Sequence, residues 1–93
     1  MFYVYILKCK DDSYYTGHTD DLERRLADHA AGLHEGYTSK RLPLELVYQE
    51  VFFTRIEALE AERKIKTWSR KKKETLIYKG WEGIIALNKD VVE

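Results

Sequence analysis

Two short runs of aromatic and β-branched residues open the chain, at residues 2 to 8 and 13 to 19. Runs of this composition are typical of β-strands, and the polar residues 10 to 12 between them predict a turn, so we expect a β-hairpin. If Tyr5 and Tyr15 project from the same face, the numbers of paired residues must sum to an even value, which requires an odd loop or a bulge. A three-residue loop satisfies this condition, and the lack of glycine argues against a two-residue turn.

The next element is predicted as a helix that begins after the candidate N-caps Asp20 and Asp21 and ends before Gly32, which suits a C-terminal cap. Its apolar positions recur at helical spacing: Leu22, Leu26 and Ala30. Residues 36 to 43 follow as a predicted loop, and residues 45 to 53 as a third strand.

The second half of the chain is predicted to be helical. Thr54-Arg55-Ile56-Glu57 matches a capping box, so a second helix begins there and runs to about Trp68. Ser69 can cap a third helix, rich in basic residues, that ends near Gly80. The mixed residues 81 to 93 predict no particular element.

Together these elements predict an α+β fold, a small three-stranded antiparallel sheet flanked by about three helices. A chain of 93 residues with 44% hydrophobic content has room for one domain with one core. We assign residues 1 to 78 to this domain and residues 79 to 93 to a C-terminal tail.

Polar residues interrupt the predicted buried face of the first helix. Counted from Leu22 at about 100° per residue, Leu26 lies at about 40°, Arg25 at about 300° and His29 at about 340°. Arg25 and His29 therefore share the apolar arc. Because arginine is seldom buried without a partner, either this arc borders a wet or anionic pocket, or the Arg25 side chain extends out to solvent.

A carboxylate lies at the edge of the buried face of the second helix. Counted from Ala58, Ile65 lies at about 340° and Glu62 at about 40°, whereas Glu60, at about 200°, faces solvent. A carboxylate at a core margin is unfavourable unless it is paired or bound to a metal ion. The periodicity leaves two explanations open: an ion pair between Glu62 and Arg25, or a metal-binding Glu62 with Arg25 nearby to neutralise a phosphate.

The charged residues balance in number but not in distribution. Sixteen basic and sixteen acidic residues cancel, so the net charge does not indicate nucleic-acid binding. Between residues 63 and 73 there is no acidic residue, and the basic ones are Arg63, Lys64, Lys66, Arg70, Lys71, Lys72 and Lys73. Such a block can follow a phosphate backbone, and it is also typical of a solvated helix face.

Several classes of protein are excluded by composition. Cys9 is the only cysteine, which excludes an internal disulfide and a cysteine-cluster metal site. The longest apolar runs, such as residues 2 to 7, are far shorter than the roughly 18–20 residues of a membrane span. The chain also lacks the features of a secretory signal. We therefore expect a cytoplasmic protein outside membranes, and the sequence indicates no obligatory protein partner and no oligomeric state.

Several short segments resemble a known family. Tyr3-Val4-Tyr5, then Tyr15-Thr16-Gly17 and Arg24-Arg25-Leu26, resemble the motifs of the GIY-YIG nucleases. The segments Ala58-Leu59-Glu60-Ala61-Glu62 and Ile65-Lys66-Thr67-Trp68-Ser69-Arg70 resemble the small stand-alone bacterial branch called UPF0213. The resemblance covers roughly residues 1 to 78, and it is specific because the order and the spacing of the segments agree as well.

This resemblance implies roles for five residues. Tyr5 and Tyr15 correspond to the tyrosines of the two triplets, of which one is held to activate the attacking water or to act as nucleophile. Arg25 corresponds to the arginine that contacts the scissile phosphate. His29 corresponds to a histidine that assists proton transfer in several branches. Glu62 corresponds to the glutamate that holds a single magnesium ion, for which manganese can substitute.

Further residues are assigned to substrate binding. His18 follows Gly17 where other branches have lysine or serine, and it is interpreted as a pocket residue. The basic side chains interpreted as contacts to DNA are Lys64, Lys66, Arg70, Lys71, Lys72 and Lys73. Many members of the family also carry a late asparagine, and the role of Asn88, in the tail, stays open.

Three functions follow as hypotheses. The first is a metal-dependent endonuclease that hydrolyses phosphodiester bonds in DNA, with a role in DNA repair or processing. The second is a non-catalytic nucleic-acid-binding module that uses the basic segment 63–73. The third is a protein-interaction domain in which the pocket residues form only an ion-pair network.

Overall fold

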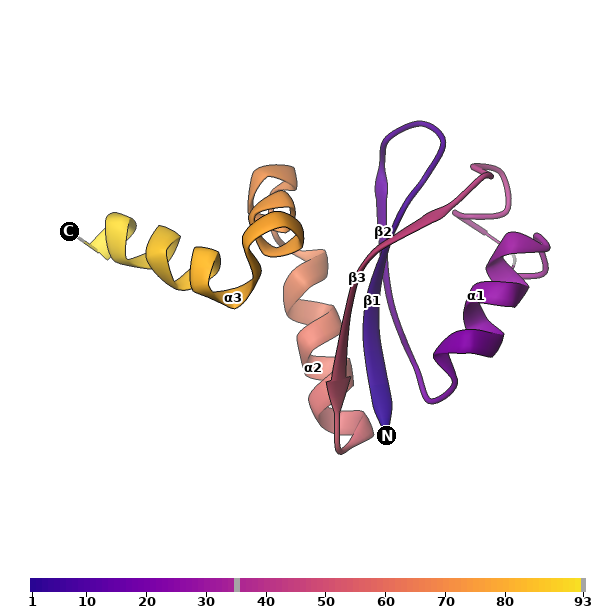
Figure 1. Ribbon diagram of the computed structural model, residues 1–93, viewed down its shortest axis with the longest axis horizontal. Helices are drawn as coiled ribbons and strands as arrows, with labels where there is room; N and C mark the ends of the chain where they lie inside the picture. The colour runs from indigo at the N-terminus through magenta and orange to yellow at the C-terminus, as the bar shows by residue number, and fades with distance from the viewer. Residues whose placement is uncertain (35, 93) are drawn as a thin grey trace.

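The structure, a computed structural model, describes residues 1–34 and 36–92, the side chains of residues 88–92 excepted. Its elements follow in the order β1 (Phe2–Lys8), β2 (Tyr14–Thr19), α1 (Leu22–Ala30), β3 (Glu45–Phe52), α2 (Arg55–Lys66) and α3 (Arg70–Val92). The sheet lies between α1 and α2, and α3 continues away from it toward the C-terminus (Figure 1). The predicted α+β class, with a three-stranded antiparallel sheet and three helices among the described residues, is confirmed.

The hairpin has the predicted parity. Tyr5 pairs with Gly17 and Leu7 with Tyr15, so the paired numbers sum to an even value. The Cys9 N–H donates to the Ser13 carbonyl at 2.8 Å, so these two residues close the hairpin and residues 10 to 12 form a three-residue loop. This odd loop gives the observed register. Asp12, the last loop residue, has a φ of 67°, a left-handed conformation that aspartate tolerates better than most residues. Tyr5 and Tyr15 consequently lie on the same face of the sheet.

The two faces of the sheet have different roles. The order of strands is β2-β1-β3, so β2 and β3 are the outer strands. Successive side chains of a strand point to opposite faces, and the even-numbered positions of β1 face α2 and α3. The buried cluster on that side comprises Val4, Ile6, Ala58, Ile65, Leu76 and Ile84. The odd-numbered face, with Tyr5 and Tyr15, lies toward α1.

The predicted helix caps of α1 and α2 are present. Asp21 accepts a hydrogen bond from the Arg24 N–H at 3.1 Å, and Gly32 follows the helix with a φ of 72°. At the start of α2, the Thr54 hydroxyl and the Glu57 carboxylate form the reciprocal contacts of a capping box. The ends of β3 and α2 differ from prediction by one or two residues, as helix and strand ends commonly do.

The C-terminal segment adds a helix that the sequence did not predict. The helical backbone that begins at Arg70 is interrupted near the predicted end, at Gly80, whose φ is 67°, and a further helical stretch of α3 follows to Val92. The part beyond the break is held to the domain, because the Trp81 indole N–H donates to the Glu50 carboxylate at 2.7 Å and Ile84 is buried in the core. Trp81 and Ile84 are three residues apart on one helical face, a spacing that the prediction overlooked. The side chain of Asn88 lies outside the described residues.

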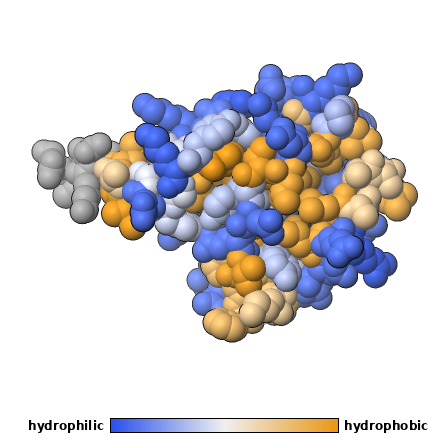
Figure 2. Space-filling view, viewed as in Figure 1, coloured by the Kyte–Doolittle hydropathy of each residue, from blue (hydrophilic) through white to orange (hydrophobic). Residues whose placement is uncertain are grey.

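The surface is predominantly hydrophilic along the rim formed by the hairpin loop and the loop before β3, and apolar residues lie between and below (Figure 2). Among the residues that the structure describes, no helix combines the length and the hydropathy needed to cross a bilayer.

Candidate active site

Three of the predicted site residues meet on the α1 face of the sheet. The Tyr5 hydroxyl lies 3.0 Å from Nε2 of His29, which reaches it from α1. The Tyr15 ring lies beside both, with centroid distances of 6.4 Å to Tyr5 and 5.4 Å to His29. Tyr5 and His29 are almost completely buried, and Tyr15 is half-buried. Two strands and a helix therefore bring these three side chains together.

Gly17 makes this arrangement possible. It pairs with Tyr5 across the hairpin, and the Tyr5 ring lies over its backbone. A Cβ atom at residue 17 would lie 2.6 Å from the Tyr5 hydroxyl oxygen, 2.7 Å from its Cζ and 3.2 Å from the Tyr15 ring. Carbon atoms do not approach so closely, so a side chain here would displace both tyrosines. The glycine lets the phenol of Tyr5 extend over β2, the outer strand.

A second hydrogen bond fixes the His29 ring from the opposite side. Nδ1 of His29 lies 2.9 Å from the hydroxyl of Thr38, which is also buried. A neutral imidazole has one donor and one acceptor nitrogen, so the Thr38 and Tyr5 hydroxyls take complementary roles. Thr38 comes from the loop before β3, where periodicity carries no information, and the sequence analysis did not identify it.

Burial sets the protonation of this pair. Burial raises the pKa of Tyr5 to about 12, the neighbouring Tyr15 adds to the rise, and the Arg25 guanidinium opposes it. Burial lowers the pKa of His29 to about 4, and the charges of His34 and Arg25 lower it further. At neutral pH both groups are therefore uncharged, and the proton of the Tyr5–His29 hydrogen bond stays on the Tyr5 oxygen.

The lowered pKa of His29 predicts a pH-dependent stability. An imidazole whose pKa is about 4 in the folded state and about 6.5 in the unfolded state binds more protons when unfolded. Its stabilising contribution is present above about pH 6.5 and is lost as the pH falls toward 4. We expect the free energy of unfolding to fall by at most about 3 kcal/mol over this window from His29 alone.

Denaturant unfolding at several pH values measures this loss. His29→Gln should remove much of the pH dependence. His34→Gln should retain most of it, because it leaves the Tyr5–His29–Thr38 contacts in place and burial is the largest cause of the lowered pKa of His29. An unchanged pH dependence in His29→Gln would contradict the assignment.

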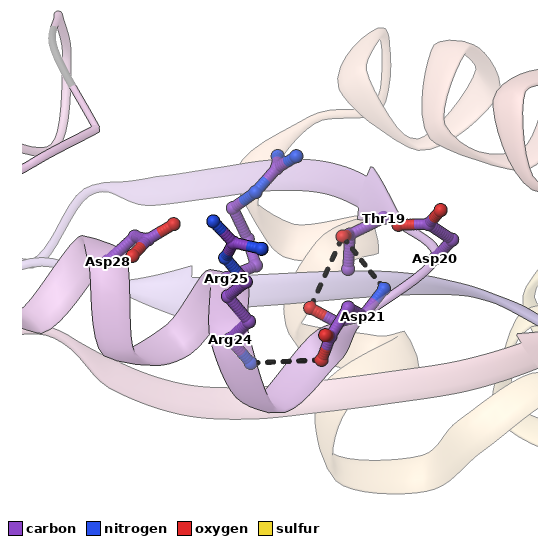
Figure 3. Close-up of a pocket in the computed structure, with 6 residues that line it drawn as sticks. All are labelled: Thr19, Asp20, Asp21, Arg24, Arg25 and Asp28. Carbon is purple, nitrogen blue, oxygen red and sulfur yellow. Dashed lines mark hydrogen bonds between the residues drawn. The ribbon is translucent and has the colours of Figure 1, made fainter.

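Arg25 borders an open pocket next to these residues. The pocket has a volume of about 540 Å³, and its lining residues are Thr19, Asp20, Asp21, Arg24, Arg25 and Asp28. The side chains of Arg24 and Arg25 rise from the same side of α1, and Asp28 is turned toward them (Figure 3). The sequence analysis left two alternatives for Arg25, a wet pocket beside it or a side chain that extends out to solvent. The structure has a pocket beside Arg25. Its lining carries both signs of charge.

Glu62 lies on the other face of the sheet, and its partners correct one prediction. Its Oε1 lies 2.6 Å from Nδ1 of His18, and its Oε2 lies 3.0 Å from Nζ of Lys66. An ion pair with Arg25 is not among the salt bridges of the described residues, because β2 lies between the α1 face, which carries Arg25, and the α2 face, which carries Glu62. Burial alone would raise the pKa of Glu62, but hydrogen bonds from His18 and Lys66 outweigh it and hold the pKa below its usual value.

The two halves of the site adjoin at the edge of β2. On one face the Tyr5 phenol extends over Gly17, and on the other His18 holds the Glu62 carboxylate against the same strand. The negative charge of Glu62 makes only a minor contribution to the raised pKa of Tyr5, after burial and the neighbouring Tyr15.

The side chains present are compatible with one weakly held divalent ion. Within residues 1–34 and 36–87, no group of three or more His, Cys, Asp or Glu side chains is placed to enclose a metal ion. Magnesium keeps several waters and is often bound by one or two carboxylates together with substrate phosphate oxygens. Glu62 is ionised and only 8% exposed, and Lys66, which is half exposed, can move away from it. Glu62 as the metal ligand remains a prediction.

The loop before β3 contributes two site residues that the sequence analysis missed. Nε2 of His34 lies 3.3 Å from the Tyr15 hydroxyl, and its ring lies 4.3 Å from the ring of His29. The Tyr37 ring stacks on Tyr15 at 6.4 Å with an interplanar angle of 25°. The available signal was a histidine just before the predicted loop of residues 36 to 43 and a tyrosine and a threonine inside it, since loops often carry functional residues.

The basic segment 63–73 does not form one continuous strip. Lys66 pairs with Glu62, whereas Lys64 lines a separate pocket with Phe52 and Trp81. Other members are engaged locally. Arg70 lies over the ring of Tyr14 and contacts Glu74, Lys72 lies over Trp68, and burial lowers the pKa of Lys73. The substrate-binding roles predicted for His18 and for this segment remain predictions.

Comparison with known proteins identifies the family. The family model described as the GIY-YIG catalytic domain matches residues 1–75. A UPF0213 protein of Staphylococcus saprophyticus is 53% identical over 78 residues, which cover 84% of this chain and 95% of that protein. A UPF0213 protein of Haloquadratum walsbyi is 49% identical over 78 residues, which cover 84% of this chain and 88% of that protein.

A solved structure agrees with both comparisons. The solution structure of a UPF0213 protein from Bacillus halodurans is similar with a TM-score of 0.56 and 45% sequence identity, over 90% of this chain and 94% of that one. Motif order, fold and sequence identity thus agree, and the chain belongs to the GIY-YIG family, within its small UPF0213 branch.

Proposed function

We propose that this protein hydrolyses phosphodiester bonds in DNA with the help of one divalent metal ion, magnesium or manganese. GIY-YIG domains form a nuclease family, and the match extends over residues 1–75. The observation that carries the proposal is the buried Tyr5–His29 hydrogen bond beside Arg25 at the edge of β2. Phosphodiester hydrolysis needs an activated water, neutralisation of the phosphoryl oxygens and stabilisation of the leaving oxygen.

Arg25 binds the scissile phosphate in this proposal. It is half-buried, lines an open pocket that a phosphate can enter, and lies close enough to Tyr5 to lower the pKa of the phenol. A planar guanidinium can contact two phosphate oxygens at once.

Tyr5 and His29 move the proton. In the resting protein the proton stays on Tyr5, because the pKa of Tyr5 is about 12 and that of His29 about 4. Negative charge of a phosphate bound at Arg25 raises the pKa of His29 and that of Tyr5 alike, so positive charge from Arg25, and from a divalent ion when one is bound, must lower the pKa of the phenol. The Tyr5 proton would then pass along the 3.0 Å hydrogen bond to Nε2. The phenolate would accept a proton from the attacking water, and His29 would give its proton to the leaving oxygen.

Glu62 would hold the metal ion, with His18 orienting its carboxylate. When bound, one divalent ion supplies positive charge that lowers the pKa of nearby hydroxyl groups and stabilises the leaving oxygen. The His18 hydrogen bond keeps Glu62 ionised and directed along the edge of β2. Such outer partners commonly fix the orientation of a metal ligand.

A screen of DNA forms tests the proposal. Duplex, flap, junction and single-stranded DNA are incubated with the protein and magnesium or manganese, and Glu62→Gln serves as the blank because it keeps the shape of the side chain and removes its charge. We expect the protein to cleave at least one form, and both Glu62→Gln and chelation of the metal to abolish the cleavage. Absence of cleavage with every form, or equal cleavage by Glu62→Gln, would reject the proposal.

A further inference from the structure

A second pocket lies between the hairpin loop and the loop before β3. It has a volume of about 450 Å³, and its lining residues are Lys10, Asp11, Lys40 and Arg41. Three cations thus surround a single carboxylate. None of these four residues belongs to the motifs or to the basic segment discussed above.

The two loops are joined firmly at this pocket. The Lys10 N–H donates to the Arg41 carbonyl at 3.0 Å. The Arg41 guanidinium donates to the Asp11 carboxylate at 3.0 Å and to the Tyr37 carbonyl at 2.8 Å. The positive charge of Arg41 is therefore paired with the negative charge of Asp11. Within the described part of the chain, no salt bridge engages Lys10 or Lys40, so two positive charges remain available to an anion.

A chain of stacked side chains connects this pocket to the active site. Cζ of Arg41 lies 3.7 Å from the centroid of the Tyr37 ring, and Tyr37 stacks on Tyr15 at 6.4 Å. The Arg41 guanidinium is thus at most about 10 Å from the Tyr15 ring. Successive phosphates of one strand are about 6–7 Å apart, because the 3.4 Å rise along the duplex axis is only one component of their separation, so this span corresponds to at most about two nucleotides.

We propose that the pocket of Lys10, Lys40 and Arg41 binds a phosphodiester group of the same DNA strand, about two nucleotides from the bond that is cleaved. This inference rests on the proposed function. Phosphate contacts position a strand and carry no sequence information, so the pocket selects substrates by strand length on one side of the cleavage site. The hydrophilic rim formed by these two loops matches such a role (Figure 2).

Salt-dependent binding tests the pocket. Binding is measured in the Glu62→Gln background, so that no cleavage interferes, with Lys10→Ala/Lys40→Ala against the control Arg55→Ala/Lys79→Ala, which removes two exposed basic side chains outside the predicted DNA contacts. Each lost phosphate contact reduces the slope of log K against log salt by about 0.9 on duplex DNA. We expect the first pair to reduce the slope by about 2 and to weaken binding about tenfold to thirtyfold at physiological salt, and the control pair to do neither.

DNA strands of different length test whether the pocket binds a phosphate of the strand that is cleaved. A strand that ends within one nucleotide of the cleavage site on the pocket side should bind the Glu62→Gln protein and its Lys10→Ala/Lys40→Ala derivative equally. An unchanged salt slope, an equal effect of the control pair, or saturation of the pocket by a mononucleotide at the affinity of the longer strand would overturn the proposal. Cleavage with an unchanged slope rejects the pocket alone, whereas a reduced slope without any cleavage rejects the nuclease and leaves the pocket as a DNA contact.

Discussion

Gly17→Ala is expected to lower the free energy of unfolding by about 1–3 kcal/mol, the usual effect of forcing an extra methyl group into a packed site. The new Cβ would lie 2.6 Å from the Tyr5 hydroxyl oxygen, and Tyr5 is rigid and completely buried. The ring must therefore move, and the Tyr5–His29 hydrogen bond must break. Thermal unfolding should show a decrease of roughly 4–8 °C for each kcal/mol in a domain of this size, and the proposed cleavage should be lost as well.

A double-mutant cycle identifies the cause of this destabilisation. In a Tyr5→Leu background the added methyl group has no phenol to displace, so Gly17→Ala should destabilise the protein much less than it does in the wild type. Equal effects in both backgrounds would show that the backbone at residue 17, and not the overlying ring, resists the substitution.

Arg25→Ala is expected to reduce the rate of DNA cleavage by about 10²–10³-fold, the effect commonly measured when one group that stabilises developing charge is removed. Arg25 is the cation that lies next to Tyr5, so its removal takes away both the phosphate contact and part of the charge that restrains the pKa of the phenol. The rate is measured at saturating DNA on the best substrate of the screen, and unfolding curves check that the fold persists.

Arg24 provides the matched control for this prediction. It belongs to the same helix and lines the same pocket, but it is more exposed than Arg25. Arg24→Ala should change the rate only a few-fold through general electrostatics, and Arg25→Lys should recover part of the loss because it restores the charge without the planar fork. If Arg24→Ala were as damaging as Arg25→Ala, the assignment of the phosphate contact to Arg25 would be wrong.

Local patterns were sufficient to predict the elements that build the site. The parity needed to place Tyr5 and Tyr15 on one face required an odd hairpin loop, and the observed register has it. The helical spacing of Arg25 and His29 predicted that both share the face of α1 toward the sheet, and His29 is buried there. These predictions succeed because periodicity and capping act over a few neighbouring residues, which the sequence displays directly.

Contacts that depend on the path of a loop could not be predicted in this way. Tyr37 and Arg41 contact the hairpin, and Thr38 contacts His29. These contacts bring together residues from separate elements, and no periodicity in the sequence indicates which of these residues will meet. The Trp81 contact with β3 was missed for the same reason.

The amino-acid sequence by itself determined the strands, the helices as far as Gly80, the parity of the hairpin register and the resemblance to the family, because each depends on neighbouring residues or on ordered motifs. Only the tertiary structure decided that Glu62 pairs with His18 and Lys66, that the basic segment 63–73 is divided between different surfaces, and that Gly17 lies beneath Tyr5. Helical periodicity places a side chain on a face of its own helix, but the partner it meets there depends on how the helices and loops pack around β2.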